Sequence, residues 1–166
     1  IWYSAAAVYE NHKVNKTVEG VQLIVKNIQG LISMVDSESI GNEVNITSTV
    51  INAGLCPKDW INENRVVNPF GGSVYFVNYP LGNPRFNFYL HSIPSSACIK
   101  IISRISGLEQ HGTTVTYYQN LGLGYLLVRS PQYVTQTFPL TPEQATTFCE
   151  GGLKEILLTF GYTRIN

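Results

Sequence analysis

The sequence predicts an α+β protein in which one long N-terminal amphipathic helix packs on an antiparallel sheet with short inserted helices. Three observations lead to this class. Apolar residues recur in alternating steps of four and three through most of residues 1–35. Two stretches between residues 73 and 91 alternate in side-chain type, as strands do, and the run Leu153–Tyr162 has apolar residues on both faces.

The first helix is predicted over Ile1–Val35. Its polar residues lie on the face opposite an apolar stripe, and this stripe is expected to pack on an apolar surface. The stripe consists of Val14, Val18, Val21, Val25, Ile28, Ile32 and Val35, widened by Ile24 and Leu31. No capping residue precedes the helix and the chain does not begin with Met, which favours a helix that once continued upstream. An ordinary first helix with a few added residues is the alternative.

The composition excludes some classes of function. The 166 residues suit a single domain, and the formal net charge is zero. Only 13% of the residues are charged and no basic run occurs, so nucleic acid is not an expected partner. No stretch of about eighteen apolar residues appears, so the sequence as given predicts a soluble chain without a membrane span. An apolar upstream extension would reverse that conclusion for the longer protein.

The chain contains three cysteines, Cys56, Cys98 and Cys149. An odd number permits at most one internal disulfide, and spacing alone does not select the pair. No CxxC pair and no Cys/His cluster with zinc spacing occurs, so neither a metal nor a cofactor is predicted.

Between the first helix and the sheet, a short helix is predicted over Val44–Ala53, ended by Gly54. Lys58–Trp60 is expected to form a helical turn or loop, with Trp60 covering the core rather than binding a ligand. Residues 68–72 (Asn-Pro-Phe-Gly-Gly) are a turn signal that leads into the first predicted strand, Ser73–Tyr79.

A second strand at residues 86–91 completes an antiparallel hairpin, because a Gly-Asn-Pro turn at 82–84 separates it from the first. His91 falls on the face opposite the phenylalanines and is expected to be solvated rather than catalytic. Residues 93–96 (Ile-Pro-Ser-Ser) open a helix that ends near Gly107. The inward side of this helix consists of Cys98, Ile101, Ile102 and Ile105.

The C-terminal half is predicted to add strands and one more helix. Thr113–Tyr118 and Tyr125–Arg129 are β-type runs, and Pro131–Pro139 is a loop or an edge strand. Residues 141–144 (Thr-Pro-Glu-Gln) combine a capping box with proline at the first helical position, which predicts a helix to Cys149. Leu153–Tyr162 is expected to be a strand in the middle of the sheet, covered on both sides.

Taken in order, these pieces resemble a type IVb pilin, of the group that includes bundle-forming and thin-pilus (PilS-like) pilins. The resemblance covers nearly the whole chain. It depends on the uncapped amphipathic helix, the turn at Val67–Gly72, the helix opened by Ile93–Cys98, and the run Thr141–Ala145 that leads to Cys149.

The resemblance implies a pilin fold in which residues 1–35 are a helical stalk remnant and residues 36–166 are a head. By similarity, Cys98 and Cys149 form the disulfide that bounds the C-terminal region, whereas Cys56 departs from the family pattern. The subunit-packing helix, with Val14, Val18, Val21, Val25, Ile28 and Ile32, docks on its own sheet, and its upstream half is expected to bundle with neighbouring subunits.

The function implied is that of a structural subunit of a type IV pilus filament, which serves adhesion, aggregation or cell-cell contact. The expected partners are other pilin subunits, the assembly machinery with its prepilin peptidase, and a host-surface receptor. The implied location is the bacterial inner membrane before assembly and the extracellular pilus afterwards, and the disulfide requires an oxidising compartment.

Other functions have less support in the residues. No nucleophile elbow, phosphate-binding loop or HExxH motif occurs, so no enzyme is predicted, although Cys98 with His91 or His111, or Cys56 with any histidine, is conceivable as a nucleophile and base. A minor pilin, a secretion-system pseudopilin and a soluble extracellular receptor or adhesin module remain as alternatives. A calcium site of the pseudopilin type is disfavoured, because no Asp occurs beyond Glu63.

Overall fold

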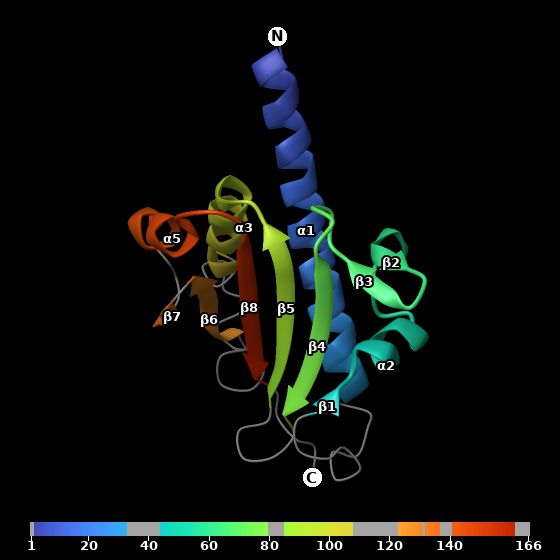
Figure 1. Ribbon diagram of the computed structural model, residues 1–166. Coiled ribbons are helices and arrows are strands. Elements are labelled where there is room, and N and C mark those ends of the chain that lie inside the picture. Colours follow the sequence, from blue (N-terminus) through green and yellow to red (C-terminus); the bar gives the residue numbers. More distant parts are fainter. Residues whose placement is uncertain are drawn as a thin grey trace.

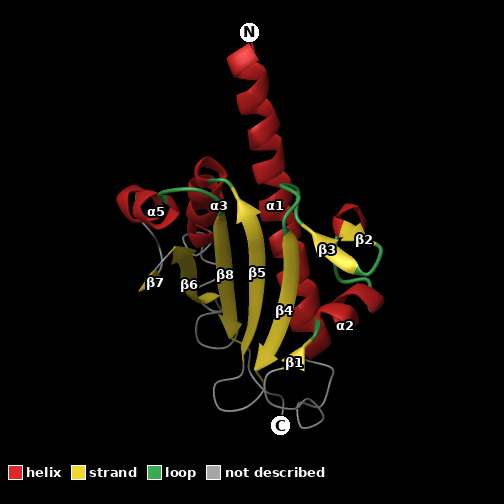
Figure 2. Cartoon of the chain, viewed as in Figure 1, coloured by secondary structure: helices red, strands yellow, loops and turns green. Residues whose placement is uncertain are grey.

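The computed structural model describes residues 2–32, 44–79, 85–107, 123–130, 132–136 and 141–161. Its longest element is α1 (Trp2–Ile32), which runs along one side of an antiparallel sheet and projects beyond it at the N-terminal end (Figure 1). The other elements, coloured by type in Figure 2, are β1 (Val44–Asn45), α2 (Thr47–Asn52), the 3-10 turn η2 (Lys58–Trp60), β2 (Ile61–Asn62), β3 (Arg65–Val67), β4 (Ser73–Tyr79), β5 (Arg85–Ile93), α3 (Ser95–Gly107), β6 (Leu123–Ser130), β7 (Gln132–Gln136), α5 (Pro142–Cys149) and β8 (Lys154–Gly161).

The sheet has the strand order β2-β3-β4-β5-β8-β6-β7, with β1 paired to β4. All of these described pairings are antiparallel. Phe88 of β5 lies between Phe76 of β4 and Leu158 of β8 in the register. The last strand therefore occupies the middle of the sheet, as its two apolar faces predicted, and the α+β class is confirmed.

The apolar stripe of α1 packs on the inner face of the sheet. Val25 is half-buried, and Ile32 and Val35 lie outside the side chains that the structure describes. Burial of the stripe explains why a helix with few charged residues is stable here, since each large apolar side chain removed from water contributes about 1.5–3 kcal/mol. The buried members are Val14, Val18, Val21, Ile24 and Ile28, in one core with Phe76, Phe86, Phe88 and Leu90.

The expectation of a helix over Val44–Ala53 was wrong at its beginning. Val44 and Asn45 form β1 against β4, and helix α2 begins only at Thr47. The amide of Ile46 donates to the carbonyl oxygen of Phe76 at 3.0 Å, and the amide of Phe76 donates to Oγ1 of Thr47 at 2.9 Å. Strand β4 thus supplies hydrogen-bond partners to residues 44–46 that a helical turn would have supplied locally. The extended conformation of this segment suits its β-branched residues.

The remaining expectations differ in outcome. η2 and the hairpin β4–β5 lie where the sequence placed a turn and two strands, and residues 132–136 of the ambiguous segment are the edge strand β7. The short strands β2 and β3 were not predicted. The predicted strand at residues 113–118 lies outside the described residues.

Helix α5 begins at the capping box that the sequence predicted. The amide of Gln144 donates to Oγ1 of Thr141 at 3.2 Å, and the amide of Thr141 donates to Oε1 of Gln144 at 2.8 Å. These two bonds satisfy amides that would otherwise lack a partner at the helix start. The helix therefore begins at a defined residue, and it ends at Cys149.

Candidate functional site

A disulfide joins α3 to α5. The Sγ atoms of Cys98 and Cys149 are 2.03 Å apart, and their Cα atoms are 5.8 Å apart. Both residues are fully buried. The structure thus contains the pair that the resemblance implied, and this bond closes a covalent loop that includes most of α3 together with β6, β7 and α5.

Cys56 is a free cysteine buried in the hydrophobic core. Its burial raises the pKa of the thiol to about 12, because the thiolate would lose its hydration there. A neutral, buried thiol is a poor nucleophile at neutral pH, and Cys98 is occupied by its disulfide. Neither Cys56 nor Cys98 therefore supplies a reactive thiolate for the nucleophile and base pairs that the sequence suggested.

We predict that a small alkylating reagent leaves Cys56, Cys98 and Cys149 unmodified in the native, non-reduced protein at pH 7, because two are bonded to each other and the third is buried as the thiol. Mass spectrometry after native treatment should show no added groups, and treatment after denaturation and reduction should show all three. Labelling of Cys98 and Cys149 without a reductant would contradict the assigned disulfide.

A row of hydrogen bonds, here called the polar seam, connects α1 to α3. Lys100 donates to Oε1 of Glu10 at 2.8 Å and to Oδ1 of Asn11 at 2.9 Å. Ser96 donates to Oε2 of Glu10 at 2.8 Å. The seam continues with a bond from Arg104 to Asn15. One signal of the polar seam is present in the sequence, the four-residue spacing of Ser96, Lys100 and Arg104, but this spacing does not identify the partner helix.

The polar seam lowers the pKa of the Glu10 carboxyl below its ordinary value of 4.5, first through the hydrogen bond from Lys100 and then through that from Ser96. A lowered pKa in the folded state means that ionised Glu10 stabilises the protein. This contribution is fully present above pH 4.5 and is lost as the pH falls through the lower pKa of the folded state.

We therefore predict that Glu10→Gln destabilises the protein by less than about 1 kcal/mol at pH 7, because the pair is partly exposed to solvent. The difference in free energy of unfolding between wild type and variant should shrink as the pH is lowered below 4.5. Urea unfolding of both proteins at pH 7 and at pH 3 measures this. A difference that grows at low pH would contradict the sign.

A second set of contacts, here called the loop clasp, holds the other side of α1. The indole of Trp60 lies on the backbone of α1 at Gly20, and Trp60 is only 2% exposed. Lys16 and Asp59 form a salt bridge of 3.0 Å, and Nδ2 of Asn27 donates to the carbonyl oxygen of Leu55 at 3.1 Å. The expectation that Trp60 covers the core is confirmed, and Gly20 marks close packing.

The two glycines of α1 should respond oppositely to substitution. A Cβ on Gly20 would lie 2.3 Å from the Trp60 ring, so Gly20→Ala is expected to cost about 1–3 kcal/mol through overpacking. Nothing lies within 4 Å of a Cβ on Gly30, so Gly30→Ala is expected to stabilise the helix by up to about 1 kcal/mol. Thermal unfolding of the two variants measures both signs, and equal effects would contradict the close approach of Trp60.

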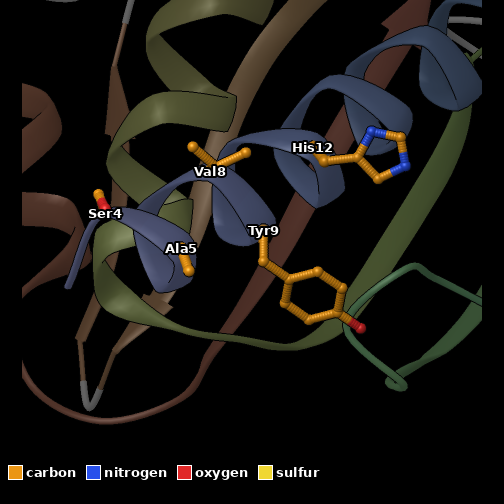
Figure 3. Close-up of a pocket in the computed structure, with 5 residues that line it drawn as sticks. All are labelled: Ser4, Ala5, Val8, Tyr9 and His12. Atoms are coloured by element: carbon orange, nitrogen blue, oxygen red, sulfur yellow. The ribbon is translucent and has the colours of Figure 1, made fainter. Parts of the chain in front are cut away.

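The N-terminal end of α1 exposes apolar side chains. Tyr3 is 94% exposed, Val8 68% and Tyr9 63%. Figure 3 shows five side chains of this part of the helix that border a shallow hollow, with Tyr9 pointing toward the turn that precedes β4. The hollow is lined by Ser4, Ala5, Val8, Tyr9 and His12.

The outer face of the sheet carries stacked rings. Tyr75 stacks on Tyr89 with 4.3 Å between ring centroids, and the ring of His91 lies 5.2 Å from that of Tyr75. Nδ1 of His91 is 3.1 Å from a carboxylate oxygen of Glu155, and the His91 side chain is 26% exposed. His91 is therefore partly buried against neighbours rather than solvated as the sequence suggested.

Two common structural features are absent from the described part of the chain. Within the described ranges, no group of three or more His, Cys, Asp or Glu residues is placed to hold a metal ion. In the same part of the chain, none of the helices combines the length and apolar character needed to cross a membrane.

The structure combines a long helix on the sheet, a disulfide between α3 and α5, and a central C-terminal strand. The structure is similar to the crystal structure of a type IVb pilin from Salmonella typhi, with a TM-score of 0.66 and 19% sequence identity over 90% of this chain and 99% of that chain. No family model matches the sequence, and no curated protein matches it. At this level of identity, the similarity establishes that the chain has the type IVb pilin fold.

Proposed function

We propose that the protein is a structural, non-enzymatic subunit of a type IV pilus filament. The observation that carries this proposal is the projecting end of α1, where Tyr3, Val8 and Tyr9 are exposed on a helix whose other half is docked on the sheet. Exposed apolar side chains gathered on one element are typical of surfaces that associate with other protein. The fold shared with a type IVb pilin supports the same conclusion.

The proposed filament uses different surfaces of each subunit at each contact. α2, with the loop that follows it, lies at one edge of the molecule, and α5 lies at the other, on the side of β6 and β7 (Figure 1). When unlike surfaces meet, the assembly remains open at both ends unless the rotation closes a ring. A helical homopolymer follows from contacts of this kind, with α1 as the subunit-packing helix toward its interior.

We also propose the route by which the subunit reaches the filament and its final location. The subunit is inserted in the bacterial inner membrane before assembly, is processed by the prepilin peptidase and the pilus assembly machinery, and then forms part of an extracellular pilus. The Cys98–Cys149 disulfide supports an oxidising compartment along this route. The finished filament serves adhesion, aggregation or cell-cell contact, in which a host-surface receptor is the external partner.

The test is electron microscopy of bacteria that carry the full-length gene, with wild type and two variants. Val8→Glu places a charge on the projecting part of α1 at a side chain that is 68% exposed, so it should fold normally but abolish filaments. Asn64→Glu, at an exposed turn between β2 and β3, is the matched control and should leave filaments intact. Filaments of normal number and length with Val8→Glu would contradict the proposed role of this surface, and a wild type without filaments would favour a minor subunit.

A further inference from the structure

Helix α3 is attached on two sides. Ser96 and Lys100 of the polar seam bond to α1, and Cys98, which lies between them in the sequence, is bonded to Cys149 of α5. One short segment of one helix therefore carries both a covalent bond to the C-terminal region and the main polar contacts to α1.

A further contact fixes the beginning of α3. Oγ of Ser95 donates to the carbonyl oxygens of Gly151 at 3.2 Å and Gly152 at 2.9 Å, just beyond the end of α5. The inner face of α3 is fully buried at Ala97 and Ile101. Because such an interior is close-packed, α3 is expected to move as a unit rather than deform residue by residue. A shift of α5 relative to the sheet would therefore reach the polar seam.

We propose that the Cys98–Cys149 disulfide and the polar seam are thermodynamically coupled through α3, so that reducing the disulfide loosens the N-terminal half of α1. In the step concerned, a dithiol reductant attacks one sulfur of the disulfide and the bond between Cys98 and Cys149 breaks. The dithiol is oxidised to its cyclic disulfide, and its two protons pass to the two cysteines. α3 is then no longer covalently bonded to α5. The positions of Ser96, Lys100 and Arg104, the donors of the polar seam, are therefore less restricted.

Coupling of this kind is reciprocal, which makes it measurable from either side. If the disulfide stabilises the polar seam by some factor, the polar seam must stabilise the disulfide against reduction by the same factor. Weakening the seam in the oxidised protein should therefore make Cys98 and Cys149 easier to reduce, although neither cysteine is altered. The coupling does not depend on whether the protein forms filaments.

The first experiment is a redox titration with dithiothreitol of the wild type and two variants. Lys100→Met removes two bonds of the polar seam and keeps an apolar side chain of similar length. It should raise the equilibrium constant for reduction about fivefold, the lower end of typical coupling. Lys16→Met, the matched control, removes the salt bridge to Asp59 on the other side of α1 and should leave the constant unchanged.

Two outcomes would overturn the proposal. If Lys100→Met and Lys16→Met shift the constant equally, reduction reports overall stability rather than the polar seam. If neither shifts it, α3 does not transmit the effect. Glu10→Gln changes the same seam from the α1 side at a partly exposed residue, so it serves if Lys100→Met does not fold.

The second experiment measures amide hydrogen exchange along α1 in the oxidised and the reduced protein. Amides at residues 10–15, beside the seam, should exchange about fivefold faster after reduction through local opening, with a rate that low concentrations of urea leave unchanged. Amides at residues 24–28 should accelerate only through the loss of overall stability, with a rate that rises with urea. Acceleration confined to residues 141–153 would contradict the coupling. Exchange at residues 10–15 that rises with urea as steeply as exchange at residues 24–28 would show that reduction acts only on overall stability and would also contradict it.

Discussion

Replacing Cys98 and Cys149 together by serine is expected to lower the free energy of unfolding by about 4 kcal/mol. The disulfide spans 51 positions of sequence, and the chain-entropy estimate for a loop of this length gives this value. In a domain of this size, each kcal/mol corresponds to about 2–4 °C in melting temperature, so the midpoint should fall by about 8–16 °C. Calorimetry or thermal circular dichroism measures the shift.

Cys56→Ala is the control for this comparison, because it removes a buried thiol and leaves the disulfide in place. Its effect should be smaller than that of the double variant, since only the packing of one sulfur atom is lost. A double variant that unfolds within about 1 kcal/mol of the wild type would mean that the disulfide does not stabilise the C-terminal region by loop closure.

Gly72→Ala is expected to be the most damaging single substitution of a small residue, with a loss of about 3 kcal/mol. A Cβ at this position would lie 1.8 Å from the carbonyl oxygen of His91, which is backbone and does not rotate away. The same site is organised by Asn68, which accepts from the amides of Phe70 at 2.9 Å and Gly72 at 3.3 Å and donates to the His91 oxygen at 2.8 Å. Displacement of the turn therefore breaks a buried network as well.

Gly71→Ala provides the contrast within the same turn. Its Cβ would meet nothing within 4 Å, but its φ of 86° is unfavourable for any residue with a Cβ. The expected cost is about 1–2 kcal/mol, from backbone strain alone. Urea unfolding should thus rank Gly72→Ala below Gly71→Ala in stability, and the reverse order would refute the contact with His91.

The elements that the sequence predicted well are those whose pattern is local. The stripe of α1 has a period that only a helix satisfies, the capping box lies within four residues, and the hairpin β4–β5 combines alternation with a turn signal. The central place of β8 was also predictable, because a strand with two apolar faces needs cover on both sides.

What could not be predicted depends on partners distant in sequence. Residues 44–46 have helical neighbours, yet they pair with β4 some thirty residues later. The partners of Glu10 in the polar seam lie 86 and 90 positions away, and no local pattern specifies them. The contact of Trp60 with Gly20 is of the same kind. The Cys98–Cys149 pair was found by resemblance, since spacing alone left the choice open.

The position of β8 also bears on how this chain acquires its fold. β8 pairs with β5 on one side and β6 on the other, and no described pairing joins those two neighbours directly. A chain synthesised from its N-terminus therefore has two separate parts of the sheet, β2 to β5 and β6 with β7, until residues 154–161 are made. Contacts between such distant segments slow folding, and open strand edges invite association with other chains. The interval before β8 pairs with β5 and β6 is thus the stage at which newly synthesised copies are most vulnerable to aggregation.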